Sequence, residues 1–238
     1  MKNFKKLFFW VIGFLFPSVC PLCGKGLMEN QEIREGLCEK CRLALVLTKE
    51  KECNLCGRPL ISERDLCLSC RNGEEKSWEK LWVIFPYTGK YRNLLSEYKF
   101  KKNLRLAEYF AEQILGIIFN TGELNNACIV PVPPRPGKIK VCGWDQVDYL
   151  VKRLKKIGKN KISVCRCLKR KKSKTQKSLG RKERMENLKG RICVQGKVPQ
   201  TAFVIDDVIT TGSTMETCAS VLKEAGAKKV YGLCLFYD

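Results

Sequence analysis

Short apolar runs alternate with longer amphipathic segments from residue 77 to the end of the chain. The runs are rich in β-branched and aromatic residues, which predicts buried strands at 77–87, 127–132, 161–166, 191–194, 202–205 and 228–235. The segments between them predict helices at 91–102, 104–120, 143–157 and 215–225. This alternation predicts an α/β fold with a parallel sheet of five or six strands flanked by helices.

The strand predicted at 202–205 leads into the most informative stretch of the sequence. Asp206 and Asp207 come at its end, a loop of Thr, Gly and Ser follows, and a helix begins near Met215. Open α/β sheets bind ligands at the carboxyl ends of strands, and the N–H groups at a helix N-terminus bind phosphate. Carboxylates accept hydrogen bonds from vicinal hydroxyls or hold Mg²⁺. The stretch therefore predicts a ribose 5-phosphate site, with an Asp-Asp turn and a simple helix cap as the alternative.

This pattern resembles the signature with which type I phosphoribosyltransferases bind 5-phosphoribosyl 1-diphosphate (PRPP). The resemblance implies that Asp206 and Asp207 face the ribose hydroxyls and that Mg²⁺ accompanies PRPP. It also implies that the 5-phosphate is bound by Thr210, Thr211, Gly212, Ser213 and Thr214. The chain has no histidine, so Asp206 and Asp207 are also the best candidates for any catalytic proton transfer.

A proline-rich loop follows the strand predicted at 127–132. Four prolines within 131–138 exclude regular structure and produce a rigid loop. In type I phosphoribosyltransferases the loop at this place holds pyrophosphate. The resemblance therefore makes Pro134, Arg135 and Lys138 candidates for pyrophosphate binding, and the alternative is an ordinary proline-rich turn.

The chain has 15 cysteines, and eight of them form four Cys-x-x-Cys pairs. The eight are Cys20, Cys23, Cys38, Cys41, Cys53, Cys56, Cys67 and Cys70. Glycine follows the second cysteine of two pairs, which suits the tight turn of a zinc knuckle. No secretory signal points to disulfides, and a redox site would need a βαβ context. We expect two structural zinc ions, each held by two successive pairs or by an interleaved pairing of the four.

The chain has a formal net charge of +21, which bears on the partners that it can bind. Such a charge favours nucleic acid, an acidic membrane or a phosphate-rich substrate, unless it reflects only a lysine-rich proteome. The densest basic run, between residues 166 and 191, predicts a mobile loop or exposed helix. Its candidates for nucleic-acid contact are Lys169, Arg170, Lys171, Lys172 and Lys174, and the alternative is a solvated face. Candidates for stacking on bases are Phe85, Tyr87 and Trp144.

The first 17 residues are basic and then apolar. The apolar part, 7–16, is too short to span a bilayer. It predicts either a helix packed on the neighbouring domain or a helix lying at a membrane interface. We therefore expect a cytoplasmic protein without a transmembrane span, with membrane association as the alternative.

With the cysteine pairs placed ahead of the PRPP signature, the whole chain resembles the ComF family. The other matching residues are Pro131-Val132-Pro133-Pro134, Gly143-Trp144-Asp145-Gln146, Gln176, Leu179, Arg184 and Asn187. The family usually has Arg-Gly-Phe-Asn-Gln where this chain has Cys142 before Gly143, so one guanidinium is missing. The resemblance implies an N-terminal segment at 1–17, a double zinc ribbon at 18–75 and a phosphoribosyltransferase-like domain at 76–238.

The ComF resemblance also implies a function in natural transformation, at the step that brings single-stranded DNA into the cytoplasm. The implied partners are PRPP or another ribose 5-phosphate ligand, single-stranded DNA and competence proteins at the inner face of the membrane. Two alternatives stay open: a DNA-binding module with a vestigial PRPP pocket, and a nucleobase phosphoribosyltransferase unrelated to competence. No nucleobase pocket can be identified from the sequence.

Overall fold

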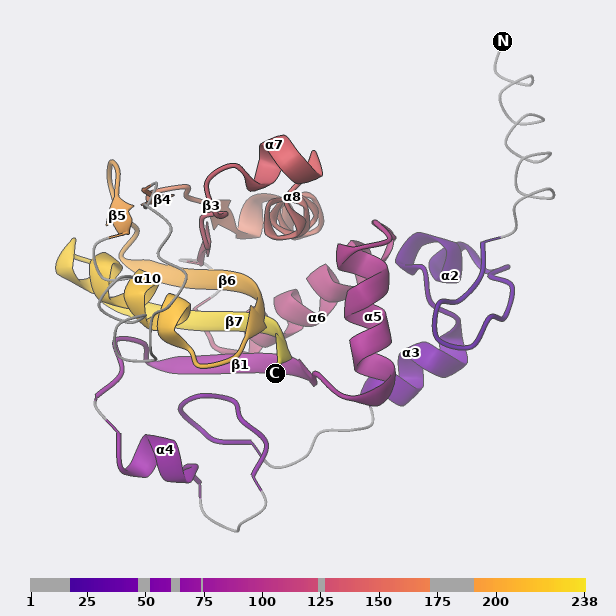
Figure 1. Ribbon diagram of the computed structural model, residues 1–238, viewed down its shortest axis with the longest axis horizontal. Helices are drawn as coiled ribbons and strands as arrows, with labels where there is room; N and C mark the ends of the chain where they lie inside the picture. The colour runs from indigo at the N-terminus through magenta and orange to yellow at the C-terminus, as the bar shows by residue number, and fades with distance from the viewer. Residues whose placement is uncertain (1–17, 47–51, 61–64, 74, 124–126, 172–190) are drawn as a thin grey trace. The chain divides into compact units, whose positions relative to one another are not determined.

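The computed structural model describes residues 18–46, 52–60, 65–73, 75–123, 127–171 and 191–238 (Figure 1). These residues form two compact units. The first comprises the described residues up to 46 together with Gly89–Tyr109. The second comprises those from 52 to 88 together with Phe110–Asp238. The boundaries inferred from the ComF resemblance, at 17 and 75, stay a prediction.

The first unit is helical. It contains α2 (Asn30–Glu35), α3 (Glu39–Val46), α5 (Gly89–Lys99) and the beginning of α6 (Leu106–Asn120). Glu35 is fully buried, and Arg34 and Arg42 approach its carboxylate oxygens to 3.6 and 3.7 Å. Because a buried charge is costly unless it is paired, these arginines make the burial of Glu35 tolerable.

A parallel sheet of five strands forms the centre of the second unit. The strands are β1 (Lys80–Pro86), β2 (Cys128–Pro131), β3 (Ser163–Val164), β6 (Thr201–Ile209) and β7 (Lys229–Tyr237). Their order is β1-β7-β6-β2-β3, and every neighbouring pair is parallel. The predicted α/β class is confirmed. Since β6 lies between β7 and β2, the loop after β6 has one neighbouring strand end on each side.

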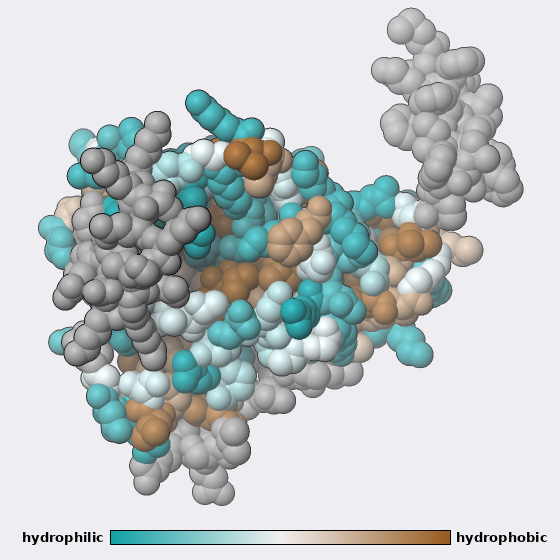
Figure 2. Space-filling view, in the orientation of Figure 1, coloured by the Kyte–Doolittle hydropathy of each residue, from teal (hydrophilic) through white to brown (hydrophobic). Residues whose placement is uncertain are grey.

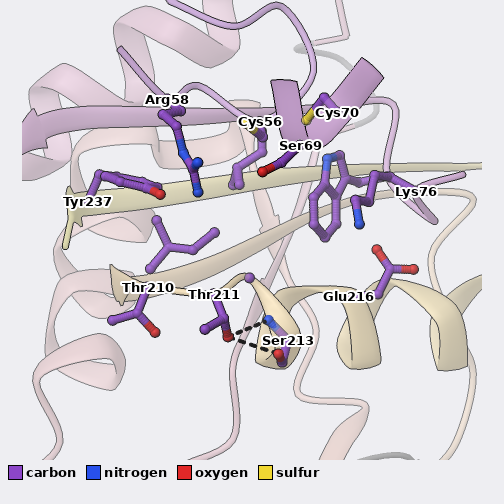
Figure 3. A pocket seen from close by; sticks show the side chains of 14 residues that line it. Cys56, Arg58, Ser69, Cys70, Lys76, Thr210, Thr211, Ser213, Glu216 and Tyr237 are labelled. Carbon is purple, nitrogen blue, oxygen red and sulfur yellow. Dashed lines mark hydrogen bonds between the residues drawn. The ribbon is translucent and has the colours of Figure 1, made fainter. Parts of the chain in front are cut away.

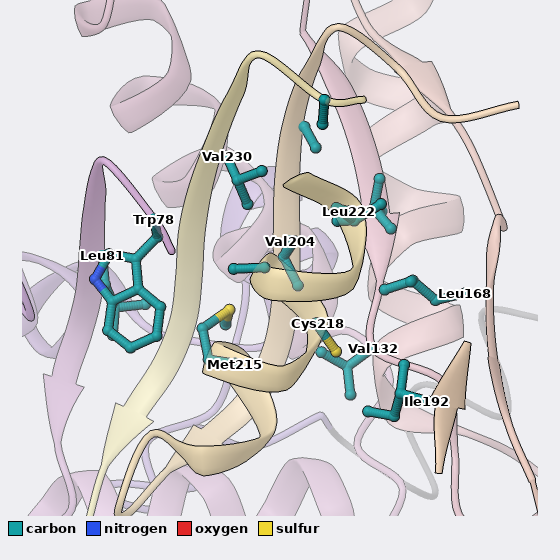
Figure 4. Packing of buried hydrophobic residues seen from close by; sticks show 14 of the residues in the cluster. Trp78, Leu81, Val132, Leu168, Ile192, Val204, Met215, Cys218, Leu222 and Val230 are labelled. Atoms are coloured by element: carbon teal, nitrogen blue, oxygen red, sulfur yellow. The ribbon is translucent and has the colours of Figure 1, made fainter. Parts of the chain in front are cut away.

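Two helices cover opposite faces of this sheet. α10 (Ser213–Glu224) packs on the face that carries Ala202, Val204 and Val230, and its Cys218 and Leu222 belong to the same buried cluster (Figure 4). α8 (Gln146–Gly158) contacts β2 and β6, and its Gln146 bonds to Asp207. Successive strand residues point to opposite faces, so Asp206 is directed to the α10 side and Asp207 to the α8 side. The remaining short helices of this unit are α4 (Leu68–Arg71), α7 (Lys138–Cys142) and the 3₁₀ turn η2 (Lys159–Lys161).

Two predictions about strands are wrong. The run at 191–194 does not join the parallel sheet: β5 (Ile192–Val194) pairs antiparallel with β4 (Leu168–Arg170) in a separate sheet. Leu168 and Ile192 are buried with the α10 cluster, so the apolar side chains of this hairpin reach a core without a place in the main sheet.

The second error concerns the end of β6, which continues through both aspartates to Ile209 instead of stopping before them. Backbone pairing with β7 continues to Tyr237, and it outweighs the low strand propensity of aspartate. As to membranes, no helix within the described ranges combines the length and apolarity needed to cross a bilayer.

Candidate functional site

The eight paired cysteines form two separate clusters of four. Cys20, Cys23, Cys38 and Cys41 make the first, and Cys53, Cys56, Cys67 and Cys70 make the second, which we call cluster 2. In each cluster all four sulfur atoms lie within 4.8 Å of one another. The successive pairing is therefore correct and the interleaved one is wrong. The first cluster belongs to the helical unit, and cluster 2 belongs to the unit with the sheet.

The geometry of both clusters fits a four-thiolate zinc site. In each turn the glycine N–H donates back to the first cysteine carbonyl, Gly24 to Cys20 at 2.8 Å and Gly57 to Cys53 at 2.9 Å. The backbone N–H of Lys25 lowers the pKa of Cys23 to about 7. Burial raises the pKa of Cys56 to about 11. Four thiols that converge in this way can share a tetrahedral metal ion, and such closed sites stabilise a fold and do not catalyse.

Cluster 2 is anchored on β1, the edge strand of the sheet. The Leu55 carbonyl accepts hydrogen bonds from the Leu81 N–H at 2.9 Å and from the Trp78 indole N–H at 3.1 Å. A Cβ on Gly57 would lie only 2.7 Å from the Leu81 carbonyl oxygen. The turn of the cluster therefore lies directly against the strand backbone, and it covers an edge that would otherwise expose free N–H and C=O groups.

The loop after β6 reverses the chain into α10. Gly212, at φ +77°, occupies the left-handed region and immediately precedes the helix. The hydroxyls of Thr211 and Ser213 lie 2.8 Å apart, and the Ser213 N–H is 3.4 Å from the Thr211 hydroxyl. A cavity of about 50 Å³ is lined by Asp206 and by Thr210, Thr211, Gly212, Ser213 and Thr214. The predicted loop residues thus come together at a helix N-terminus, where the macrodipole favours an anion.

The two aspartates have different surroundings. Asp206 is half-buried beside the loop cavity, and burial together with the adjacent Asp207 raises its pKa well above the ordinary value. Asp207 is buried, and its carboxylate accepts a 2.7 Å hydrogen bond from the Gln146 side chain. Adjacent positions on a strand therefore place one carboxylate at the cavity and the other against α8.

A chain of polar contacts links Asp207 to the proline-rich loop. The Gln146 side-chain oxygen accepts from the Lys138 ammonium at 2.5 Å, and the same ammonium contacts Asp145 at 2.7 Å. Asp145 also caps α8 by accepting from the Asp148 N–H at 2.8 Å. Lys138, predicted as a pyrophosphate ligand, is therefore already ion-paired. Gln146 was noticed in the sequence only as part of a family motif, and the motif did not reveal its bond to Asp207.

Arg170 lies near Asp206, and Arg135 and Arg191 lie near Arg170. Arg170, at the end of β4, is half-buried, and its Nε is buried without a hydrogen-bond partner among the described residues. Burial lowers the pKa of Arg170, the charge of Asp206 opposes that shift, and the charges of Arg135 and Arg191 add to it. Arg135 is exposed on the proline-rich loop, next to the half-buried Pro134. Arg170 was predicted to contact nucleic acid, but in the structure its side chain lies close to the aspartate site.

A larger cavity lies between cluster 2 and the loop after β6 (Figure 3). Its volume is about 220 Å³. Figure 3 shows Arg58, Cys56, Ser69 and Cys70 on one side and Thr210, Thr211 and Ser213 on the other. The remaining lining residues are Lys76, Trp78, Leu81, Ile209, Gly212, Glu216 and Tyr237. We call this space the Trp78 cavity. The sequence carried no signal for it, because its walls come from segments far apart in the chain.

The aromatic and basic residues predicted to contact nucleic acid differ in their exposure to solvent. Phe85 cannot stack on a base, because it is buried against Phe110 and Phe236, with ring centroids 6.0 and 5.4 Å away. Tyr87 and Trp144 are half-buried, and Lys169 and Lys171 are exposed. Several predicted residues lie outside the described part of the chain: Lys172, Lys174, Gln176, Leu179, Arg184, Asn187 and the segment 1–17.

The short helix α7 ends at Cys142, where the family usually has arginine. Cys142 is exposed, and Ile139 and Val141 are 54% and 86% exposed. Figure 2 shows apolar atoms at the surface over α7. This face is therefore apolar where an arginine would have supplied a cationic donor.

Comparisons with known proteins agree with the paired cysteine clusters and give relatives that match most of the chain. The family model for the double zinc ribbon domain matches residues 11–71. Competence protein F of Haemophilus influenzae is 25% identical over 206 residues, covering 83% of this chain and 88% of that protein. Competence protein ComFC of Streptococcus pneumoniae is 27% identical over 225 residues, covering 89% and 96%. Over most of its length the chain is therefore similar to proteins of the ComF family.

A further relative, DNA utilization protein YhgH of Escherichia coli, is 26% identical over 221 residues, which cover 84% of this chain and 96% of that protein. Among solved structures, the chain is similar to a hypoxanthine phosphoribosyltransferase from Staphylococcus aureus at 11% identity and a TM-score of 0.34, over 56% of this chain and 63% of that one. It is also similar to a phosphoribosylpyrophosphate synthetase from Mycobacterium smegmatis at 17% identity and a TM-score of 0.34, over 53% and 33%. The similarity that covers most of the chain is the one to the two competence proteins and YhgH.

Proposed function

We propose that this ComF-like protein binds PRPP at the loop between β6 and α10. The observation that carries the proposal is that Asp206 and the Thr210–Thr214 loop line one cavity at a helix N-terminus. Backbone N–H groups and hydroxyls at such a place suit a phosphate, and a carboxylate beside it suits ribose hydroxyls. These are the two features that a ribose 5-phosphate presents together.

The raised pKa of Asp206 supports the same ligand. Without a ligand, burial and the adjacent Asp207 disfavour the ionised form of this carboxyl. Hydroxyl donors, or Mg²⁺ accompanying PRPP, would favour the carboxylate and restore its usual pKa. Binding at Asp206 therefore relieves an unfavourable interaction in the free protein. Asp207 acts from the other face, where Gln146 holds it and connects it to the loop that carries Arg135.

Arg170, which lies near Asp206, and its neighbour Arg135 suit the pyrophosphate group of PRPP. Arg170 has a buried Nε without a partner among the described residues, and Arg135 and Arg191 are close enough to lower its pKa. Fork-shaped guanidinium groups bind phosphate oxygens in pairs, and a buried donor gains most from such a partner. We therefore assign pyrophosphate binding to Arg135 and Arg170, and we assign Lys138 to the support of Gln146.

Calorimetric titration of the zinc-loaded protein with PRPP and Mg²⁺ tests the proposal. Ser213→Ala removes one hydroxyl from the cavity and should weaken PRPP binding about fivefold or more. Ser220→Ala, on the same helix but bonded to Glu224, is the matched control and should bind like the wild type. Arg170→Gln should weaken PRPP binding about tenfold but change ribose 5-phosphate binding much less, because that ligand has no pyrophosphate. Absence of PRPP binding by the wild type would refute the proposal.

We further propose that the protein acts in the uptake of single-stranded transforming DNA. The support comes from relatives named competence protein F and competence protein ComFC, and from the net charge of +21. Binding that neutralises phosphates weakens steeply with salt. Titration of a labelled oligo(dT) over a salt series should therefore give a steep negative slope. A DNA affinity independent of salt, or no affinity at low salt, would contradict this proposal.

A further inference from the structure

We propose that cluster 2 regulates ligand binding at the loop Thr210–Thr214, which we call the phosphate loop. The loop binds its ligand tightly only while the four thiols of the cluster hold a metal ion. The inference rests on the proposed PRPP site and adds a regulatory element to it. Two lines of contact carry it, because they run from the turn of cluster 2 to the two ends of the phosphate loop.

The first line of contact begins at Leu55, in the turn between Cys53 and Cys56. The Leu55 carbonyl accepts a hydrogen bond from the Trp78 indole N–H at 3.1 Å. Trp78 is buried and lies against the phosphate loop, since a Cβ on Gly212 would be 3.6 Å from its ring. One side chain therefore contacts the cluster through its N–H and the loop through its ring.

Ser77, the residue before Trp78, extends this line to α10. Its hydroxyl donates to the Glu216 carboxylate at 2.6 Å, and its backbone N–H donates to the same carboxylate at 3.1 Å. Glu216 lies in the first turn of α10, and its own N–H donates to the Gly212 carbonyl at 2.8 Å. Hydrogen bonds to an ionised group are among the stronger ones in proteins. The segment after cluster 2 thus holds the helix N-terminus where the phosphate loop joins α10.

The second line of contact reaches the beginning of the phosphate loop. Arg58, which closely follows Cys56, places its guanidinium 5.2 Å from the Tyr237 ring centroid (Figure 3). Tyr237 pairs with Ile209 in the sheet, and the Asp238 N–H donates to the Ile209 carbonyl at 2.9 Å. Ile209 is the last residue of β6, directly before the loop. Both lines border the Trp78 cavity, and together they connect cluster 2 to the start and the end of the loop.

Cluster 2 has two states that differ enough to move these contacts. Among its described residues from 52 to 73, the buried side chains are those of Cys53 and Cys67. A segment with so small an apolar core folds on binding a metal ion and loses its structure without it. Loss of the metal then displaces the Leu55 carbonyl and the Arg58 guanidinium together. Both ends of the phosphate loop lose their support, and binding to the loop weakens because its donors are no longer held in place.

Such coupling between two sites is reciprocal. A metal ion at cluster 2 that favours a ligand at the phosphate loop is itself bound more tightly, by the same factor, when that ligand is present. Couplings of this kind typically amount to about 5–150-fold. The first cluster belongs to the helical unit, so it is the internal control: its affinity for zinc should not depend on the ligand.

The experiment titrates the zinc-loaded full chain with a zinc-selective chelator, with and without saturating PRPP and Mg²⁺. A short pulse of alkylating agent marks the freed thiols, and mass spectrometry reports them separately for residues 20–41 and 53–70. PRPP should raise the chelator concentration that frees cluster 2 about fivefold or more, and should change that of the first cluster less than about twofold. Ser77→Ala and Trp78→Phe each remove one hydrogen bond of the first line and should reduce the effect at cluster 2 to below about twofold.

Ser220→Ala is the matched control, since its hydroxyl also donates to a glutamate of α10, Glu224 at 2.7 Å, but on neither line of contact. It should behave like the wild type. If Ser77→Ala does not retain both zinc ions, Glu216→Gln takes its place, because it weakens the same bond.

PRPP binding is measured by calorimetry on the same samples. If PRPP binds without affecting cluster 2, or affects both clusters equally, the regulation is wrong and the PRPP site stands. An effect that persists unchanged in Ser77→Ala and Trp78→Phe would show that the ligand only shields the thiols, which also overturns the regulation. Absence of PRPP binding by the wild type refutes the PRPP proposal itself, and the regulation with it.

Discussion

Gly57 should tolerate alanine far less well than Gly24, although each follows the second cysteine of a Cys-x-x-Cys turn. Both glycines have positive φ, +66° for Gly57 and +75° for Gly24. An alanine in this left-handed region costs roughly 1–2 kcal/mol at either position. The two substitutions therefore share one cost, and any difference between them must come from the surroundings of the new methyl group.

Those surroundings differ sharply. A Cβ on Gly24 meets nothing within 4 Å. A Cβ on Gly57 would lie 2.7 Å from the Leu81 carbonyl oxygen and 3.0 Å from the Val83 nitrogen. Both are backbone atoms of β1, so they cannot move away cheaply, and overpacking of this kind costs about 1–3 kcal/mol more. We expect Gly57→Ala to lose about 2–5 kcal/mol of stability and Gly24→Ala about 1–2 kcal/mol.

Urea unfolding, followed by tryptophan fluorescence and by zinc release to a colorimetric chelator, measures both costs. Displacement of cluster 2 from β1 should also lengthen the 3.1 Å bond from the Trp78 indole to Leu55, so the native fluorescence should change in Gly57→Ala alone. Equal costs for the two variants, with unchanged fluorescence, would show that cluster 2 does not depend on close contact with β1.

Three further predictions concern the aspartate site and the metal. Gln146→Leu removes the charge-assisted bond to Asp207 and should cost about 1.5–3 kcal/mol in urea unfolding; a cost below about 0.5 kcal/mol would contradict it. Burial and the adjacent Asp207 raise the pKa of Asp206 in the folded state. The stability that this carboxyl contributes is therefore present below about pH 3.8, its ordinary pKa, and is lost as pH rises through the raised pKa. Asp206→Asn should therefore gain stability over the wild type as pH rises. If the melting temperatures of the two proteins change in parallel with pH, the prediction is wrong. Removal of zinc by a chelator should lower the melting temperature and abolish ordered clusters, which circular dichroism and metal analysis can follow; an unchanged melt would exclude a structural role for the metal.

Local patterns in the sequence were enough for the features that depend on neighbouring residues. The Cys-x-x-Cys spacing predicts two converging thiols within each turn, and the apolar run before the aspartates predicts a buried strand. The Thr/Gly/Ser loop predicts a turn just before α10, because glycine suits the positive φ that Gly212 adopts there. These predictions hold because turn geometry and strand burial are decided within a few residues.

The ends of the strands, and which strands join the main sheet, were less predictable from the sequence. β6 extends through both aspartates because β7 pairs with them, and β5 leaves the main sheet because its apolar residues find a core beside α10. Phe85 seemed available for stacking in the sequence, but two distant phenylalanines enclose it. In each case a partner distant in the chain decided the outcome, and such pairing leaves no local trace.

The sequence by itself determined that the chain carries four Cys-x-x-Cys turns and an aspartate-hydroxyl loop on an α/β scaffold, since each is a local pattern. Only the tertiary structure decided that the cysteine pairs join in succession and that Asp206 and Asp207 serve opposite faces. It alone brought Arg58 beside Tyr237 and placed cluster 2 next to the phosphate loop. The physical reason is that sheet order and side-chain packing are set by contacts between distant segments, whose energies the local sequence does not encode.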